Sequence, residues 1–318
     1  MQMRKLGRSD LAIAPLMLGG NVFGWTADEK TSFSILDAFV DAGFNAIDTA
    51  DVYSRWAPSG GGSSEKVLGA WFKASGKRDR VLIATKFGMD MGEDNKGLSA
   101  KYMMRAVEDS LSRLGTDRID LYQSHRDDPE TPQEEAMEAF SSLVAQGKVR
   151  VIGASNFDAA RLKSANAIAE KGGWPRYETL QPLYNLYDRR GFEDSLAETC
   201  LAEEIGVIPY FGLASGFLTG KYRSEADLSK SPRGRAVKRF LDDRGMAILG
   251  ALDEAAKRHS ATPARVALAW LMAKITAPIA SATSVEQLHE LLKAAELKLD
   301  SEAMAALDKA SAPQAVPA

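Results

Sequence analysis

Four residues whose side chains carry charge or move protons follow three apolar runs in the first half of the chain. Asp48 with Tyr53, then Lys86, and then His125 stand at or just after the ends of these runs. A tyrosine hydroxyl has a pKa of about 10, and a nearby ammonium lowers that value because it favours the phenolate. We therefore expect Lys86 to prime Tyr53 as a general acid, and Asp48 to hold Lys86 in place. His125 is expected to hydrogen-bond the same substrate oxygen, which becomes negatively charged during the reaction.

Each of these residues also has a structural explanation when it is considered alone. A lysine at a strand end can extend its ammonium into water along an apolar stem. A lone histidine is more often a structural residue than a catalyst. The shared placement of Asp48, Lys86 and His125 favours the chemical interpretation, because the carboxyl ends of parallel strands in a barrel all open on the side where barrel enzymes build their active sites.

The elements that must position these residues follow a regular alternation of apolar runs and amphipathic segments. Nearly continuous apolar runs are typical of parallel strands that are covered on both faces. The runs lie at 16–19, 45–50, 81–88, 119–125, 149–156, 179–185, 206–212 and 277–284. Eight such strand–helix units predict a (β/α)8 TIM barrel, an α/β fold, as one domain over residues 1–318. A doubly wound sheet is the alternative, but no G-x-G-x-x-G sequence follows the first run.

Further elements are expected outside the eight units. Residues 1–15 predict an N-terminal β-hairpin with its turn near Gly7–Asp10. Residues 232–259 predict a helical insertion that adds to the helices near the C-terminus, and residues 312–318 predict a flexible tail. Ser99 and Thr131 are the start signals of the helical patterns at 99–115 and 131–148.

Composition excludes several classes of function. The 40 Lys and Arg residues against 43 Asp and Glu give a net charge of -3, which provides neither a nucleic-acid footprint nor a polybasic membrane patch. Cys200 is the only cysteine, so the chain has no internal disulfide and no cysteine-based metal cluster. The first ten residues lack the apolar core of a secretory signal. The longest apolar stretch is interrupted by Lys274 and Pro278, so we expect a cytoplasmic protein with no membrane span.

The successive motifs resemble those of the aldo-keto reductase family, in order and over nearly the whole chain. They are "FNAIDTADVYS", "VLIATKFG", "LYQSHRDD", "VRVIGASNF" and "LQPLYNL". The resemblance implies a (β/α)8 barrel that reduces the carbonyl of a small-molecule aldehyde or ketone with a nicotinamide cofactor and without a metal. The family's catalytic aspartate, tyrosine, lysine and histidine fall on Asp48, Tyr53, Lys86 and His125.

The same resemblance implies a set of cofactor contacts. Ser155, Asn156 and Gln181 match residues that bind the carboxamide, and Tyr210 matches the aromatic residue that stacks on the nicotinamide. The pyrophosphate loop and the eighth unit supply the remaining matches, which are Leu213, Ser215, Gly216, Lys221, Ser281, Thr283, Gln287 and Glu290. Trp56, in the loop after Tyr53, is expected to form an apolar wall of the substrate pocket.

The cofactor segments also depart from the family pattern. Phe211 and Gly212 replace a common Ser-Pro pair, and Ser281 replaces a usual glycine. Neither Thr283 nor Ser284 is the basic residue that often binds a 2′-phosphate, and Leu291 stands where an adenine-binding asparagine is frequent. NADP(H) is the favoured cofactor, and NAD(H) is the alternative.

Two other functions compete with carbonyl reduction. One is a nicotinamide-binding redox sensor with slow turnover, like the aldo-keto-reductase-type β subunits of potassium channels. The complete set Asp48, Tyr53, Lys86 and His125 disfavours it. The other is a metal-dependent aldolase or isomerase on the same fold. Three histidines and no carboxylate–histidine ligand cluster disfavour a metal site. The sequence fixes neither the substrate nor the oligomeric state.

Overall fold

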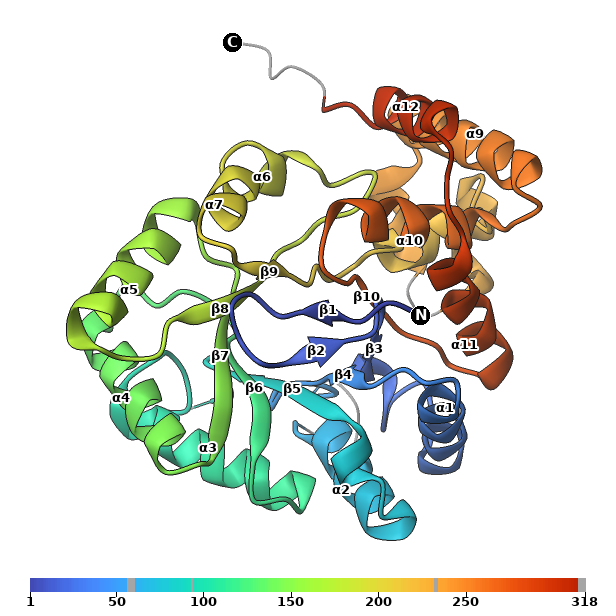
Figure 1. The fold of residues 1–318 in the computed structure, drawn as a ribbon. Coiled ribbons are helices and arrows are strands. Elements are labelled where there is room, and N and C mark those ends of the chain that lie inside the picture. Colours follow the sequence, from blue (N-terminus) through green and yellow to red (C-terminus); the bar gives the residue numbers. More distant parts are fainter. Residues whose placement is uncertain (56–60, 93, 232–233, 314–318) are drawn as a thin grey trace.

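Eight parallel strands form the centre of the molecule. The computed structural model describes residues 1–55, 61–92, 94–231 and 234–313. Within them the strands follow the chain around the ring in the hydrogen-bonded order β10-β3-β4-β5-β6-β7-β8-β9 (Figure 1). They are β3 Met17–Gly19, β4 Ala46–Asp48, β5 Leu82–Phe87, β6 Ile119–Ser124, β7 Val149–Ser155, β8 Tyr177–Gln181, β9 Gly206–Val207 and β10 Ile279–Ala280.

Backbone hydrogen bonds close the ring between its first and last strands. Thr276 and Ala277 donate their N–H groups to the carbonyl of Val207 at 3.1 and 3.2 Å, and Ile279 donates to Pro209 at 3.0 Å. Closure removes the two free sheet edges. The eight apolar runs predicted from the sequence therefore become eight barrel strands, and the expected (β/α)8 barrel is confirmed.

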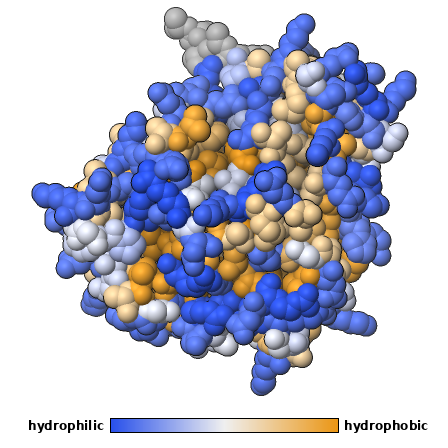
Figure 2. Space-filling model, viewed as in Figure 1, coloured by the Kyte–Doolittle hydropathy of each residue, from blue (hydrophilic) through white to orange (hydrophobic). Residues whose placement is uncertain are grey.

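The N-terminal hairpin covers the end of the barrel where the strands begin. Its strands β1 Arg4–Lys5 and β2 Ala12–Ile13 pair antiparallel, as predicted, and lie across the ring in Figure 1. Leu6, Leu11 and Ile13 pack with inward-facing barrel residues such as Met17 and Ala84. Figure 2 shows that apolar side chains gather towards the centre of this face, while polar ones cover its outer rim. The hairpin thus completes the inner core at this end of the barrel.

Helices cover the outside of the barrel. Those between or after the strands are α1 Glu29–Asp41, α2 Ser63–Ser75, α3 Ala100–Leu114, α4 Gln133–Ala145, α5 Ala159–Gly172, α6 Arg190–Glu193, α7 Leu196–Ala202, α10 Pro263–Lys274 and α11 Val285–Leu292. The extra ones are α8 Gly234–Val237, α9 Asp243–Arg258 and α12 Ser301–Ala310. Short 3-10 turns are η1 Gly20–Val22, η2 Arg78–Arg80, η3 Ala214–Thr219, η4 Glu225–Lys230, η5 Lys238–Phe240 and η6 Lys293–Glu296. Among the described helices, none is long and apolar enough to cross a membrane.

Helix boundaries agree with the sequence signals at Ser99 but not at Thr131. The Ser99 side chain accepts from the Tyr102 N–H and caps α3. Pro132, not Thr131, is the N-cap residue of α4, and the Thr131 hydroxyl donates to Asp128 at 2.6 Å. The insertion predicted over 232–259 is divided between α8, η5 and α9. Of the predicted tail, residues 314–318 lie outside the described part, and the Ala312 carbonyl accepts from Arg244 at 3.3 Å.

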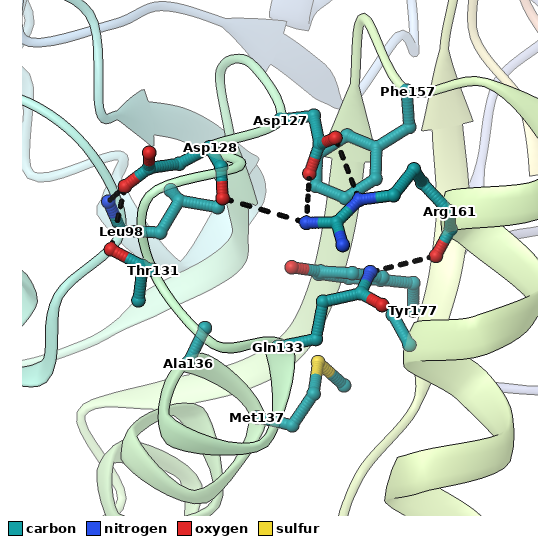
Figure 3. Close-up of a pocket in the computed structure, with 11 residues that line it drawn as sticks. Leu98, Asp127, Asp128, Thr131, Gln133, Ala136, Met137, Phe157, Arg161 and Tyr177 are labelled. Carbon is teal, nitrogen blue, oxygen red and sulfur yellow. Dashed lines mark hydrogen bonds and ion pairs between the residues drawn. The ribbon is translucent and has the colours of Figure 1, made fainter.

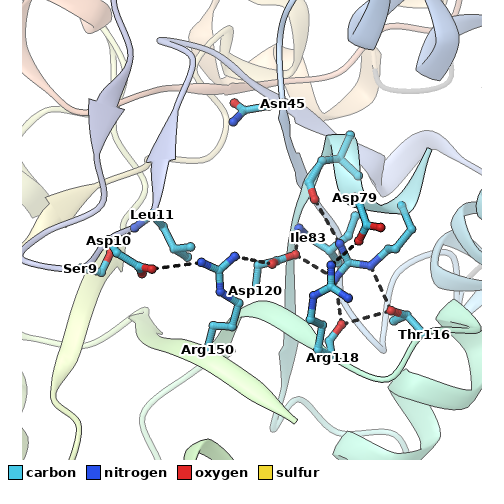
Figure 4. Close-up of polar contacts among 12 residues, drawn as sticks. Ser9, Asp10, Leu11, Asn45, Asp79, Ile83, Thr116, Arg118, Asp120 and Arg150 are labelled. Atoms are coloured by element: carbon cyan, nitrogen blue, oxygen red, sulfur yellow. Dashed lines mark hydrogen bonds and ion pairs between the residues drawn. The ribbon is translucent and has the colours of Figure 1, made fainter. Parts of the chain in front are cut away.

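A buried carboxylate links several elements at the hairpin end of the barrel (Figure 4). Asp120, which is 1% exposed, accepts from the Ile83 N–H and from Arg78 at 2.9 Å each, and from Arg150 at 3.1 Å. Arg150 also reaches Asp10 in the hairpin turn at 3.2 Å. Because a buried charge is costly unless it is paired, these bonds hold the barrel end in one arrangement. This network does not extend to the opposite end of the barrel, where the carboxyl ends of the strands lie.

Candidate active site

The Lys86 ammonium lies at the centre of the residues that the sequence singled out. Its Nζ donates to the Tyr53 hydroxyl at 2.9 Å, to the Asp48 carboxylate at 2.9 Å and to the Thr49 carbonyl at 2.7 Å. The lysine side chain is fully buried, so all three of its donors are satisfied by protein oxygens. The ammonium is therefore fixed in position and cannot extend into water like a typical strand-end lysine.

The Asp48 carboxylate joins opposite sides of the barrel. One of its oxygens accepts from Lys86 and, at 3.2 Å, from the Tyr53 hydroxyl. The other accepts from the side-chain amide of Gln181 at 2.9 Å. Gln181 ends β8, which is separated from β4 by three strands in either direction around the closed ring. This bond crosses the barrel interior and holds the carboxylate from the side opposite to the lysine.

Strand register explains why these side chains meet. Asp48 pairs with Ala84, and Lys86 lies two residues beyond Ala84 on β5. Residues two apart point to the same face of a strand. Because Ala84 belongs to the core inside the barrel, Lys86 points inward too. Lys86 in turn pairs with Gln123, two residues before His125, so all three strands bring their ends to one mouth.

His125 lies beside Tyr53, with the two rings nearly perpendicular. The two ring centroids are 6.0 Å apart at an interplanar angle of 79°, and the backbone N–H of His125 donates to the Phe87 carbonyl at 2.8 Å. The imidazole Nδ1 is buried and has no hydrogen-bond partner among the described residues. Burial, followed by the charges of Lys86 and Arg126, lowers the pKa of His125 well below its usual range. The imidazole is therefore neutral at neutral pH.

The phenol of Tyr53 is held in its protonated form. Burial first, and then the Asp48 carboxylate, raise the pKa of Tyr53 well above its usual range. The sequence had led us to expect a lowered value from Lys86 alone. Burial also lowers the pKa of Lys86, against the opposing effect of Asp48. The effect of the ammonium on the phenol is thus outweighed here, because desolvation and the carboxylate both disfavour the phenolate.

The residues matched to carboxamide binding form one hydrogen-bonded chain. The Ser155 hydroxyl donates to the Gln181 carbonyl at 2.8 Å, and the Asn156 amide donates to the His125 carbonyl at 2.9 Å. The Tyr210 hydroxyl donates to the Asn156 side-chain oxygen at 2.9 Å. Asn156 has a φ of 55°, a left-handed conformation that asparagine adopts more readily than most residues. The structure therefore brings these four residues together next to His125.

The loop matched to pyrophosphate binding contains a tight left-handed turn. Ser215 and Gly216 have φ values of 57° and 95°, and Leu213 precedes them. A Cβ atom added at Gly216 would lie 3.3 Å from Cε and 3.4 Å from Nζ of Lys221. The missing side chain at Gly216 therefore lets the Lys221 ammonium lie over the backbone of this turn.

Residues of the eighth unit mostly bind one another. The Ser281 hydroxyl bonds to Asn21 at 2.5 Å, next to the end of β3. The Gln287 side-chain oxygen accepts from the backbone N–H and the hydroxyl of Thr283, each at 3.0 Å. Glu290 pairs with Arg265 at 2.5 Å and with Lys293 at 3.4 Å. No bond in this group reaches the residues around Lys86.

One predicted residue lies outside the described part of the chain, and two groups that act on Lys86 were not predicted. Trp56, the predicted wall of the substrate pocket, lies outside the described residues. Sequence reasoning missed the Thr49 carbonyl and Asp51, a carboxyl that is 3% exposed. Burial, followed by the charge of Glu65, raises the pKa of Asp51 to about 7. The position of Asp51 in the apolar "TADVYS" segment was the available signal. Among described side chains, no group of three or more His, Cys, Asp and Glu is arranged to hold a metal.

Comparison with known proteins identifies the family of the chain. The family model described as "Aldo/keto reductase family" matches residues 15–312. The chain is 37% identical to "Uncharacterized oxidoreductase YrpG" of Bacillus subtilis (strain 168), over 97% of this chain and 95% of that protein. It is 32% identical to "Aldo-keto reductase AMT2" of Alternaria alternata, over 98% and 92%. It is 30% identical to "Versiconal hemiacetal acetate reductase" of Aspergillus parasiticus, over 99% and 98%. The chain is an oxidoreductase that belongs to the aldo-keto reductase family.

Proposed function

We propose that this protein reduces aldehyde or ketone carbonyls to alcohols with NAD(P)H, that the reverse oxidation uses the same groups, and that Tyr53 is the general acid. The observation that carries this proposal is the 2.9 Å contact between Lys86 Nζ and the Tyr53 hydroxyl, with Asp48 bound to both. Membership of the aldo-keto reductases, which use NAD(P)H for carbonyl reduction, supports the reaction class.

Tyr53 supplies the proton in this mechanism. Its raised pKa keeps the hydroxyl protonated until a substrate oxygen develops negative charge and becomes a stronger base than before. As the proton leaves, the phenolate forms 2.9 Å from the ammonium of Lys86, which stabilises the new charge. Asp48 keeps the ammonium in position and does not need to contact the substrate.

His125 orients the substrate oxygen. Because the imidazole is neutral, it can donate one N–H to the oxygen without giving up its proton. Ser155, Asn156 and Tyr210 are joined by hydrogen bonds. They hold the backbone of His125 in place, because the Asn156 amide donates to the His125 carbonyl. Hydride for the carbonyl carbon would come from a nicotinamide held at this mouth beside Asn156 and Tyr210.

The residues present fit such a cofactor. The left-handed turn at Gly216, with the Lys221 ammonium beside it, offers backbone and a cation to a pyrophosphate. Tyr210 and Asn156 lie next to His125, so a nicotinamide held against them would lie at the same mouth as Tyr53. Leu213 and Ser215 would contact the phosphates from the same turn.

For the choice between the two nicotinamides, NADP(H) is favoured by the family pattern and NAD(H) is the alternative. Ser281, Thr283, Gln287 and Glu290 would surround the adenosine part. Ser284 caps α11 by accepting from the Gln287 N–H at 3.2 Å, and Arg265 and Lys293 are both paired with Glu290. These pairings support NAD(H), because a 2′-phosphate is held best by an unpaired basic side chain.

A panel of aldehydes and ketones tests the proposal. The purified protein is mixed with each carbonyl compound and NADPH, and then NADH, while the absorbance of the reduced nicotinamide is followed. Loss of absorbance that depends on the carbonyl compound and survives a chelator is the expected result. No turnover with any compound, or activity abolished by the chelator, would contradict the proposal. A slow turnover with tight cofactor binding would favour the redox-sensor alternative.

A further inference from the structure

Arg126 is an exposed arginine that follows His125 directly at the mouth of the barrel. Its guanidinium makes no hydrogen bond or ion pair with any residue in the described part of the chain. By contrast, Arg161, Arg189 and Arg239 each pair with a carboxylate. An unpaired guanidinium beside a proposed catalytic histidine is available to bind an anionic group of a ligand.

The two acids that follow Arg126 do not neutralise it. Both oxygens of Asp127 accept from Arg161, at 2.8 Å each, and these side chains point towards one another over the ring of Tyr177 in Figure 3. Asp128 accepts from the Leu98 N–H at 2.8 Å and from the Thr131 hydroxyl at 2.6 Å. The sequence "HRDD" therefore places two carboxylates next to Arg126 in the chain, but the fold pairs both of them with other residues.

Electrostatic effects place the Arg126 charge near the reacting groups. Together with burial and Lys86, it lowers the pKa of His125. Burial and Asp188 raise the pKa of Tyr210, and the charge of Arg126 opposes them. Asp188 is itself paired with Arg239 at 2.9 Å. Since Lys86 is neutralised by Asp48, Arg126 is left as an uncompensated positive charge on the rim next to His125 in the chain, and its charge acts on both His125 and Tyr210.

We propose that Arg126 binds a carboxylate carried by the carbonyl substrate, so that the preferred substrates are anionic aldehydes or ketones. The inference rests on the proposed function and specifies its substrate class. A guanidinium binds a carboxylate through two parallel hydrogen bonds, which fixes orientation as well as affinity. A substrate held at the rim by its carboxylate presents its carbonyl inwards to Tyr53 and His125. The positive rim also raises the local concentration of anionic substrates.

The experiment compares a matched pair of substrates, 4-carboxybenzaldehyde and its neutral methyl ester, in steady-state kinetics. The variants are Arg126→Gln, which removes the positive charge, and Arg126→Lys, which keeps the charge but cannot form the two parallel hydrogen bonds of a guanidinium. Arg80→Gln is the control, because Arg80 is an exposed arginine in η2 at the other end of the barrel. It changes net charge by the same amount as Arg126→Gln.

We expect the unmodified protein to show a lower KM for the acid than for the ester. Arg126→Gln should raise the KM for the acid about tenfold, the order expected for one charge-assisted hydrogen bond, and leave the ester unchanged. Arg126→Lys should retain part of the preference, Arg80→Gln should retain all of it, and added salt should weaken it.

Different failures have different meanings. Reduction of both compounds with equal KM, or an Arg126→Gln protein that still prefers the acid, would overturn the role of Arg126 and leave the proposed function intact. Failure to reduce either compound or any member of the carbonyl panel would overturn the proposed function, and this inference with it.

Discussion

The Nζ atom of Lys86 lies 2.9 Å from the hydroxyl of Tyr53, and both groups are bound to the same carboxylate oxygen of Asp48. This contact pairs a proton donor with the cation that stabilises its conjugate base. The donor stays protonated before the reaction, because burial and Asp48 raise the pKa of Tyr53. Proton transfer then produces an ion pair where a neutral hydroxyl and an ammonium stood before.

Tyr53→Phe removes the proton donor and leaves the ring. We expect kcat to fall by at least about 100-fold, as is typical for loss of a general acid, because no other described hydroxyl bonds to Lys86. Binding of the reduced nicotinamide, followed by its fluorescence, should change little. Comparable kcat values for the two proteins with a good substrate would remove Tyr53 from this role.

Lys86→Met and Asp48→Asn test whether the pair acts as a unit. Each change should lower kcat strongly, and the double variant should lose little more than Lys86→Met alone, because Asp48 acts through the lysine. Lys86→Met also leaves Asp48 buried without its cation, so urea unfolding should show lower stability.

Asp120→Asn is the control for this pair, because it weakens a buried ion-pair network at the hairpin end of the barrel. It should lower stability while kcat per folded molecule stays unchanged. Additive losses in the double variant, or an equal kcat loss in Asp120→Asn, would contradict a paired role for Lys86 and Asp48.

Asp51→Asn should change how stability depends on pH. The folded-state pKa of Asp51 is about 7, raised from 3.8 by burial, so between these values the folded protein holds a proton that the unfolded chain has lost. The free energy of unfolding therefore falls as pH rises through this window, and the full contribution is present only below about pH 4.

Between pH 5 and pH 8 the titration of Asp51 should lower the free energy of unfolding by about 3 kcal/mol. The Asp51→Asn protein should not show this decrease. Urea unfolding at several pH values measures it, with Asp94→Asn, at an exposed position, as the control. Parallel pH curves for the Asp51→Asn and unmodified proteins would show that Asp51 does not titrate in this window.

Ser284→Arg should shift the cofactor preference towards NADPH. An arginine at this position would offer a 2′-phosphate the unpaired cation that Arg265 and Lys293 do not provide, since both pair with Glu290. We expect the KM for NADPH to fall about tenfold and the KM for NADH to stay nearly constant. Ser284→Ala separates this effect from loss of the helix cap, which costs about 1 kcal/mol. An unchanged KM ratio in Ser284→Arg would place the phosphate elsewhere.

The strands and the central contact could be predicted because both depend on local patterns. Each apolar run was long enough to mark a strand covered on two faces, and strand ends in a parallel barrel must share one side. Lys86 lies two residues after an inward-facing alanine, so its direction follows from the strand period. Contacts within one strand or between neighbouring strands are therefore accessible from sequence.

Features that depend on partners far along the chain could not be predicted. The pKa of Tyr53 depends on its burial, which the whole barrel determines. Thr131 looked like a helix cap, yet its hydroxyl bonds to Asp128. Arg126 is left unpaired because Arg161, which lies in α5 of the following strand–helix unit, pairs with the adjacent Asp127. Sequence gives the residues of such a network but not which of them pair.

The hydrogen bond from Gln181 to Asp48 has a consequence for how this protein is made. The two residues stand 133 positions apart, and the ring closes only when residues 276–279 reach the segment 207–209. A ribosome has released Asp48, Tyr53, Lys86 and His125 long before it synthesises the residues that shut water out around them. A nascent or truncated chain therefore contains the reactive residues but leaves them exposed to water. We expect it to become catalytically active only when the last strand has closed the barrel.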